Sequence, residues 1–135
     1  MKKYAIIVAG GSGTRFGSTL PKQFVPLGGV PVLMRTIKAF ADYDRDINIV
    51  VALPSEHLTL WGDICASRNF DVPHKVVEGG ANRFESVRNA LFAVNETECL
   101  VAVHDGARPL VSRQVIAAGF ETAARCGTAI PTVPV

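Results

Sequence analysis

Apolar runs rich in β-branched residues recur along this chain, and none of them alternates strictly between apolar and polar positions. A strand with one face in water needs that alternation, whereas a strand of a parallel sheet is buried on both faces. The expected strands are residues 4–9, 47–53, 72–77, 100–103 and 129–133. The pattern therefore indicates a mostly parallel sheet covered by helices on both sides.

Segments of helical period lie between these strands. Residues 31–41 form the first. Leu58, Trp61 and Cys65 mark one face of the second. Ser55 is the candidate cap of this second helix, because a serine oxygen can accept a hydrogen bond from a free amide of the first turn.

Two further helices carry clearer boundary signals. Asn82 stands three residues before Glu85, which is the spacing of a capping box. Ser112 and Gly127 are the expected first and last boundaries of the final helix. The positions expected to face the sheet are Phe84, Val87, Leu91 and Val94 in the third helix and Ile116, Phe120 and Ala123 in the fourth.

This order of elements predicts an α/β fold, a doubly wound and mostly parallel sheet joined by right-handed crossovers. A chain of 135 residues with 48% hydrophobic content suffices for one domain, spanning residues 1–135. Val135 follows the last expected strand almost directly, with no helix to cover that strand. We therefore expect a C-terminal part to be missing.

The charge of the chain limits the classes of binding partner, and its cysteine content indicates the cellular compartment. A net charge of +2 arises from 14 basic and 12 acidic residues spread along the chain, so we expect a small anion as partner and neither nucleic acid nor membrane. The 3 cysteines show no spacing typical of zinc or of a disulfide framework, which favours a reducing cytoplasm. No apolar stretch approaches the roughly 18 residues of a membrane span.

Three unusual loops follow expected strands, at the sheet edge where ligands of parallel sheets bind. The first contains Gly10, Gly11, Ser12 and Gly13, followed by Arg15 and Lys22. Its glycines permit close backbone approach to an anion, and its two cations can neutralise a triphosphate. The alternative is an ordinary turn with two solvated cations, but the combination favours phosphate binding. It matches neither a Walker A loop nor a dinucleotide fingerprint.

The other two loops carry a carboxylate and a glycine pair. Asp105 follows an apolar strand and can hold Mg²⁺ together with phosphate oxygens, while Arg108 can grip a second phosphate. Alternatively, Asp105 pairs with Arg108 or caps a turn. Gly80 precedes a helix whose N-terminus attracts anions, and Arg83 at that start opposes the helix dipole, which indicates another task for it.

Together these motifs resemble the 2-C-methyl-D-erythritol 4-phosphate cytidylyltransferases of the non-mevalonate isoprenoid route. The resemblance covers the whole chain, and the first loop alone would indicate only the wider sugar-nucleotide transferase superfamily. The matching segments are residues 9–15, 21–24 and 103–109, and Gly79 and Gly80 with Arg83 and Ser86. The resemblance implies a Rossmann-like fold of the nucleotide-diphospho-sugar transferase type, incomplete at the C-terminus.

The family's roles can be carried over residue by residue. The resemblance implies CTP as substrate, Mg²⁺ as the divalent cation, a cytoplasmic location and a homodimer when full length. Catalysis would fall to Arg15 and Lys22, and metal binding to Asp105. The implied nucleotide contacts are Ala9, Gly10, Gly11, Ser12, Gly13, Gly80, Ala81, Arg83 and Ser86, and the implied substrate contacts are Asp105, Gly106 and Arg108.

The implied reaction is attack by a phosphate oxygen of the polyol phosphate on the α-phosphorus of CTP, with release of pyrophosphate. A later segment of the family, absent from this sequence, supplies a Thr, a Lys and a dimerisation arm. Alternatives are a ribitol 5-phosphate cytidylyltransferase, a guanylyl- or uridylyltransferase, and a nucleotide-binding module without catalysis. Gly106 and Ala107 weakly favour methylerythritol phosphate, because the ribitol enzymes tend to carry Ser-Val there.

Overall fold

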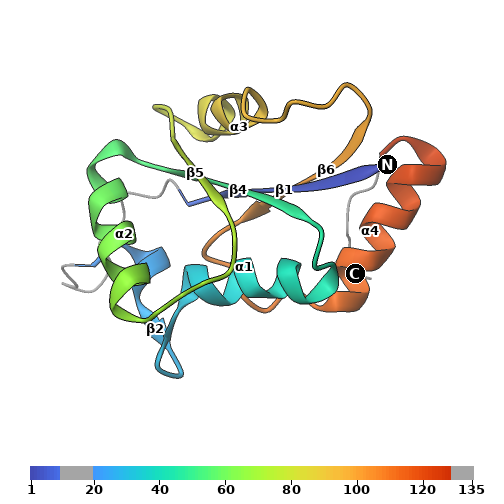
Figure 1. The fold of residues 1–135 in the computed structure, drawn as a ribbon. Helices are drawn as coiled ribbons and strands as arrows, with labels where there is room; N and C mark the ends of the chain where they lie inside the picture. The colour runs from blue at the N-terminus through green and yellow to red at the C-terminus, as the bar shows by residue number, and fades with distance from the viewer. Residues whose placement is uncertain (10–19, 129–135) are drawn as a thin grey trace, which may run out of the picture.

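A computed structural model describes residues 1–9 and 20–128. Its main sheet has four parallel strands in the order β5-β4-β1-β6 (Figure 1). These strands are β1 (Lys2–Val8), β4 (Asn48–Leu53), β5 (Lys75–Glu78) and β6 (Cys99–Asp105). The predicted parallel sheet is confirmed, and four of the five expected strands are present. The fifth, residues 129–133, lies outside the described residues.

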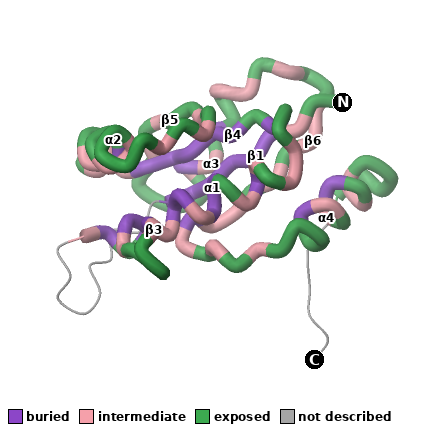
Figure 2. Tube along the Cα trace, turned by 60° about the horizontal axis from the view of Figure 1, so that its bottom comes forward, coloured by how far each residue is buried: buried purple, intermediate pink, exposed green. Residues whose placement is uncertain are grey.

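Helices cover both faces of the sheet, as predicted (Figures 1 and 2). One core packs α1 (Val32–Tyr43), α2 (Leu58–Ser67) and α4 (Arg113–Cys126) against one face of the sheet. A smaller core packs α3 (Arg83–Leu91) against the other face. A short hairpin of β2 (Pro26–Leu27) and β3 (Val30–Pro31), which the sequence analysis did not predict, precedes α1.

The two central strands explain the continuous apolar runs. Every residue of β1 from Tyr4 to Val8 is buried, and so is every residue of β4 from Ile49 to Leu53. Successive side chains enter opposite cores: Ala5 and Ile7 pack with α1, while Ile6 packs with α3. A strand between two helical layers has no wet face, so it has no polar positions.

The capping signals of the last two helices are confirmed. The Asn82 side chain accepts a hydrogen bond from the Glu85 amide at 2.9 Å, and Ser112 Oγ accepts one from the Val115 amide at 3.1 Å. Gly127 ends α4 with a φ of 89°, a left-handed conformation that glycine adopts without strain. The expected cap Ser55 is wrong, because Ser55–His57 forms a 3₁₀ turn and α2 begins only at Leu58.

The expected inner face of α3 is correct only at Val87, which packs against the smaller core. Phe84 and Leu91 are 74% and 44% exposed, and Val94 lies beyond the end of the helix. The helix instead buries Ser86 and Ala90, and Ala90 shares the smaller core with Ile6, Val8 and Val50. Small residues on this face let the helix pack closely on the sheet, so residue size rather than hydropathy marks its buried side.

Candidate active site

Three strands of the sheet end at one edge, and a loop leaves each of them there. In the register of the strands, Val8 at the end of β1 stands beside Ala52 of β4 and Asp105 of β6, and Leu53 stands beside Glu78 of β5. The loops after β1, β5 and β6 therefore leave from the same edge, which faces left in Figure 1. Because neighbouring strands lie about 4.8 Å apart, the β5 loop starts about 10 Å from the β1 loop.

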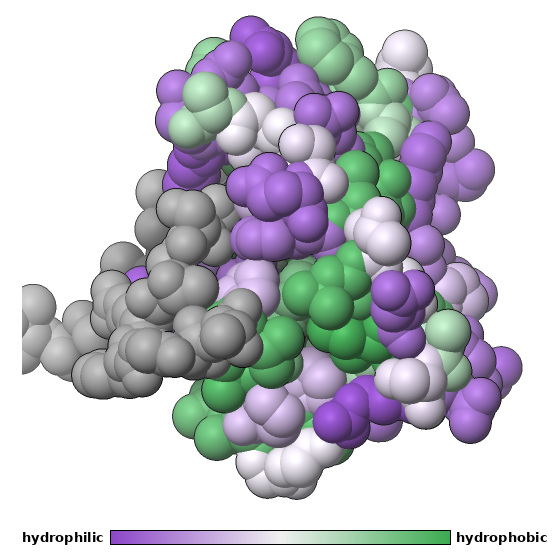
Figure 3. Space-filling model, turned by 90° about the vertical axis from the view of Figure 1, so that its left-hand side faces the viewer, coloured by the Kyte–Doolittle hydropathy of each residue, from purple (hydrophilic) through white to green (hydrophobic). Residues whose placement is uncertain are grey.

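The surface at this edge has a mixed character. Figure 3 views the molecule from this side and shows a hydrophobic patch bordered by hydrophilic residues. Such a surface suits a ligand with a flat organic part and a charged part. Five residues predicted for the first loop, Gly10, Gly11, Ser12, Gly13 and Arg15, lie outside the described residues.

The first loop begins at a rigid point. The Ala9 amide donates to the Ala52 carbonyl at 3.0 Å, and the Ala9 carbonyl accepts a hydrogen bond from Gln23 Nε2 at 2.9 Å. Both groups of Ala9 are thus bonded within the protein, and the residue is buried. Any contact of Ala9 with a ligand is limited to the second lone pair of its carbonyl and to its side chain.

Lys22 projects from a firmly packed turn. It opens the 3₁₀ turn η1 (Lys22–Phe24), in which Gln23 and Phe24 are buried and Lys22 is exposed. The Phe24 ring stacks on Trp61 of α2, with ring centroids 5.4 Å apart. Within residues 1–9 and 20–128, Lys22 forms no ion pair. Its ammonium group is therefore available to an anionic ligand.

The second loop needs both of its glycines. The Gly79 amide donates to the Leu53 carbonyl at 2.6 Å, and a Cβ on Gly79 would lie 3.3 Å from that carbonyl oxygen. A Cβ on Gly80 would overlap with the Cβ of Glu85. The Gly80 amide donates to Ser86 Oγ at 3.0 Å, and Ser86 is buried. The Ser86 hydroxyl therefore holds the loop, although its own proton remains free to donate.

Two residues of the second loop region that were predicted to contact the nucleotide are exposed to solvent. Ala81 and Arg83 are exposed, and Arg83 forms no ion pair with any residue in the described part of the chain. An unpaired arginine in the first turn of α3 opposes the helix dipole, as noted from the sequence. Its guanidinium is free to meet a negative group at this edge.

The third loop places Asp105 at the end of β6. Asp105 Oδ1 accepts a hydrogen bond from the Ala107 amide at 2.9 Å, and Oδ2 lies 3.6 Å from Arg108 Nε. The turn cap and the ion pair of the alternative interpretation are therefore both present. His104 Nε2 lies 2.8 Å from the Arg108 carbonyl and so links the start of the loop to its end. The Arg108 pair is long and its guanidinium is largely exposed, so it holds Arg108 only weakly.

Asp105 meets the requirements of a magnesium ligand that works together with phosphate oxygens. Its carboxylate is 40% exposed, and Oδ2 has no other partner than the distant Arg108 among the described residues. Residues 1–9 and 20–128 contain no group of three histidine, cysteine or acidic side chains that could hold a metal alone. Mg²⁺ is commonly held by one or two carboxylates, several waters and the phosphates of its ligand, and this donor set fits that mode.

Gly106 is the tightest point of the third loop. Its amide donates to the Val8 carbonyl at 2.8 Å, and a Cβ at this position would lie 3.0 Å from the Ala9 Cβ. Its carbonyl accepts a hydrogen bond from Thr36 Oγ1 of α1 at 2.9 Å. Gly106 is buried and has no side chain. Its predicted contact with the substrate would therefore have to be made by its backbone.

Gln23 and Thr36 are functional positions that the sequence motifs did not assign. A signal for Thr36 exists in the sequence, because it stands among Leu33, Ile37 and Phe40 on the apolar face of α1. A threonine in that position must find a hydrogen-bond partner inside the protein. The identity of the partner, however, cannot be read from the helix.

Residues 4–135 match the model of the 2-C-methyl-D-erythritol 4-phosphate cytidylyltransferase family. The match includes all three loops. The chain belongs to this family. Membership agrees with the resemblance drawn from the loop motifs.

Individual cytidylyltransferases support the same assignment. A protein of this name from Azobacteroides pseudotrichonymphae is 48% identical over 134 residues, 99% of this chain and 60% of the relative. One from Phocaeicola vulgatus is 47% identical over 135 residues, 100% of this chain and 61% of the relative. The chain thus spans about three fifths of the length of these cytidylyltransferases.

The fold is shared with a solved member of the family. The crystal structure of the 4-diphosphocytidyl-2C-methyl-D-erythritol synthase from Anaerococcus prevotii superposes with a TM-score of 0.73 at 26% identity. The superposition covers 93% of this chain and 51% of the other. It supports the cytidylyltransferase architecture for the described sheet and helices, including the edge from which the three loops leave.

Proposed function

We propose that the protein containing this chain transfers CMP from CTP to 2-C-methyl-D-erythritol 4-phosphate and releases pyrophosphate, in isoprenoid precursor biosynthesis. The observation that carries the proposal is that the family match includes three loops that leave one edge of the sheet. One of these loops carries the Asp105 carboxylate, and the other two carry Lys22 and Arg83, which form no ion pair within residues 1–9 and 20–128.

The proposed chemistry depends on charge neutralisation. A phosphate oxygen of the polyol phosphate bonds to the α-phosphorus of CTP, while the bond from that phosphorus to the bridging oxygen breaks and its electrons leave with pyrophosphate. The nucleophile is already an anion, so it needs little help from a general base. Lys22 and Arg15 would stabilise the charge that develops around the α-phosphorus.

Asp105 and Arg108 would act on opposite parts of the substrates. Mg²⁺, when bound, would neutralise phosphate charge, and Asp105 is the residue proposed to hold it. Arg108 would seat the phosphate of the polyol. Its contact with Asp105 is weak enough to be exchanged for two charge-assisted hydrogen bonds to phosphate.

The cytosine base is proposed to lie between the first and second loops. Gly10 to Gly13 would wrap the nucleotide, and Gly80, Ala81 and Ser86 would complete the pocket, with Arg83 bracing it. The family often carries an acidic residue at position 81, whereas this chain has alanine. Ala81 can offer only backbone groups to the base, so its contact would not depend on the side chain.

The remaining proposals concern the whole protein. We propose a cytoplasmic homodimer that acts on small molecules and binds neither nucleic acid nor membrane. The even spread of charge and the spacing of the cysteines support this, as does family membership. In the described part of the chain, no helix has both the length and the apolar content needed to cross a membrane.

One assay tests the proposed reaction. The full-length protein is incubated with Mg²⁺, each of the four nucleoside triphosphates, and either methylerythritol phosphate or ribitol phosphate, and released pyrophosphate is measured. We expect release only with CTP and methylerythritol phosphate. Release with UTP or GTP instead would refute cytidylyl transfer, and preference for ribitol phosphate would select the ribitol alternative. Binding of CTP without release would indicate a module without catalysis.

A further inference from the structure

The buried polar side chains of the described residues gather at the loop edge, the edge of the sheet from which the loops after β1, β5 and β6 leave. There are three of them, Gln23, Thr36 and Ser86, and each is at most 2% exposed. Each bonds to the backbone at the root of a different loop: Gln23 at Ala9, Ser86 at Gly80, and Thr36 at Gly106. A buried polar group is costly unless it is hydrogen-bonded, so such groups are retained where their bonds are needed.

Thr36 connects α1 to the third loop. Its Oγ1 lies 2.9 Å from the Gly106 carbonyl and 3.2 Å from the Val32 carbonyl one turn back in its own helix. A hydroxyl has one proton and donates fully to one acceptor at a time. The shorter contact reaches a residue 70 positions later in the chain. Thr36 therefore donates mainly to the third loop and not to its own helix.

The Thr36 contact continues to the root of the first loop. Gly106 lies against Ala9 so closely that a Cβ on Gly106 would be 3.0 Å from the Ala9 Cβ. The carbonyl of Ala9 is held by a hydrogen bond from Gln23 Nε2. We define the joint as the chain of contacts Gln23, Ala9, Gly106 and Thr36. It fastens the roots of the first and third loops to each other.

The joint lies next in sequence to two proposed active residues. Lys22 immediately precedes Gln23, and Asp105 immediately precedes Gly106. Lys22 and Asp105 are both on the solvent side of the joint, with Lys22 exposed and Asp105 half-buried. A shift of Gln23 therefore moves Lys22 relative to Asp105, and a shift of Gly106 moves Asp105 relative to Lys22.

We propose that Gln23 and Thr36 are positioning residues that set the distance between the Lys22 ammonium group and the Asp105 carboxylate. This inference rests on the proposed function for its catalytic consequence. Both side chains are buried and bonded to the backbone, so their proposed role does not require contact with the substrate. Electrostatic catalysis depends on charges that are already in place before the reaction, and misplacement by a fraction of an ångström weakens it.

The first test compares two substitutions of Thr36 in the full-length protein. Thr36→Val keeps the shape and removes the hydroxyl, whereas Thr36→Ser keeps the hydroxyl and removes a buried methyl group. We expect Thr36→Val to lower kcat about tenfold with little change in the affinity for CTP. Thr36→Ser should keep a kcat close to that of the wild type. Thr59→Val, on the exposed side of α2, is the matched control.

The pair separates positioning from stability. Both Thr36 variants should melt at a lower temperature than the wild type, so activity that merely followed stability would fall in both. Equal losses of kcat in Thr36→Val and Thr36→Ser would overturn the inference, and so would an unchanged kcat in Thr36→Val. If the wild type itself releases no pyrophosphate from CTP, the proposed function fails instead.

A second test examines the joint without nucleotide chemistry. The Gly106 amide is bonded to the Val8 carbonyl at the centre of the joint, so its hydrogen exchange reports opening there. We expect faster exchange in Thr36→Val and in Gln23→Met, and unchanged exchange in Thr36→Ser. The double variant should lose less kcat than the product of the two single losses, because both act on one joint. Independent losses, or unchanged exchange in both single variants, would overturn the proposal.

Discussion

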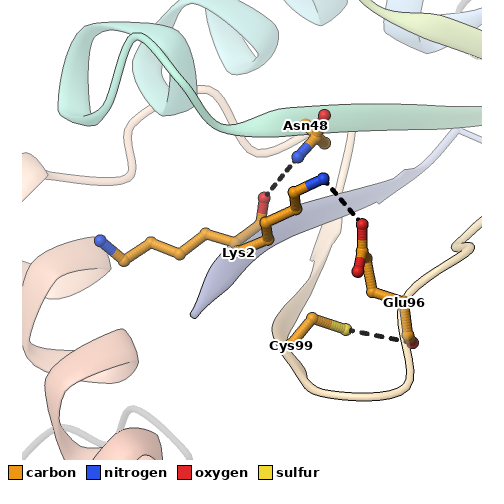
Figure 4. Close-up of polar contacts among 5 residues, drawn as sticks. Lys2, Asn48, Glu96 and Cys99 are labelled. Carbon is orange, nitrogen blue, oxygen red and sulfur yellow. Dashed lines mark hydrogen bonds and ion pairs between the residues drawn. The ribbon is translucent and has the colours of Figure 1, made fainter.

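The two ends of the sheet use charge in opposite ways. At the end where the strands begin, Lys2 Nζ lies 2.7 Å from a Glu96 oxygen and Lys3 Nζ lies 3.3 Å from an Asp44 oxygen. Figure 4 shows the Lys2–Glu96 pair beside the Cys99 turn. At the end where the strands finish, Lys22 and Arg83 form no ion pair with any residue in the described part of the chain.

Pairing at the first end is reflected in proton affinities. The hydrogen bond to Glu96 raises the pKa of the Lys2 amine, and a hydrogen bond to Tyr43, with help from Asp44, raises the pKa of Lys3. The hydrogen bond from the Asp46 amide lowers the pKa of Asp44, and Lys3 makes a smaller contribution in the same direction. The Lys3 ammonium also lies over the Tyr43 ring, 5.4 Å from its centroid. These charges stabilise the fold and have partners already.

This difference between the two ends of the sheet indicates where an anionic ligand would bind. Cations at the loop edge stay exposed, while the buried polar groups beneath them hold backbone atoms and not the cations. The internal hydrogen bonds here hold the loop roots, while Lys22 and Arg83 have no ion-pair partner among the described residues, so this edge is prepared for an anion that comes from outside.

The largest effect is expected for Lys22→Ala in the full-length protein. We expect kcat to fall about a hundredfold, with a much smaller loss of CTP affinity, because Lys22 would act mainly on charge that develops in the transition state. Steady-state kinetics and CTP binding measure the two losses. Lys2→Ala, which removes a paired lysine at the opposite end, should leave kcat unchanged. Equal losses of kcat and affinity would show that Lys22 serves ground-state binding.

The next effect concerns the metal. Asp105→Asn keeps an oxygen for the Ala107 amide but removes the charge, so the concentration of Mg²⁺ needed for half-maximal rate should rise about tenfold or more. The rate is measured against Mg²⁺ at saturating CTP. Asp63→Asn, on the exposed face of α2, is the control. Unchanged activity at limiting Mg²⁺ would remove Asp105 from the metal site.

A pair of glycine substitutions tests the packing of the loop edge. In Gly106→Ala the new methyl group would lie 3.0–3.2 Å from Ala9, Leu33 and Ile7, and we expect a loss of about 1–3 kcal/mol in the free energy of unfolding. Gly62→Ala in α2 meets no atom within 4 Å and should gain about 0.5–1 kcal/mol. Urea denaturation measures both. Equal stability of Gly106→Ala and the wild type would mean that the joint is loosely packed.

The smallest effect is a pH dependence at the opposite end. Because the folded protein lowers the pKa of Asp44 below its ordinary 3.8, Asp44 contributes stability above that value and loses it as the pH falls through the folded pKa. Asp44→Asn should therefore destabilise the protein at pH 6 by less than about 1 kcal/mol. Its difference from the wild type should vanish at lower pH. A difference that stays constant across this range would exclude the ionised carboxylate as the cause.

Local patterns predicted much of the fold. The expected strands and helices were close to those observed because burial on both faces, helical period and capping residues act within a few positions of the chain. Asn82, Ser112 and Gly127 illustrate this, since each acts on a neighbour three to four residues away or on its own backbone. Ser55 failed as a cap because it begins a 3₁₀ turn instead, and Phe84 failed because α3 packs on the sheet through Ser86, Val87 and Ala90.

The sequence by itself determined the alternation of strands and helices, the glycines of the loops, and the residue types that can meet a phosphate. Only the tertiary structure decided that Lys2 is paired, that Lys22 has no ion-pair partner among the described residues, and that Thr36 reaches Gly106. The physical reason is distance along the chain. Backbone geometry and capping depend on adjacent residues, whereas the partner of a charge or a hydroxyl depends on which strands stand side by side. That arrangement is settled by packing the whole sheet.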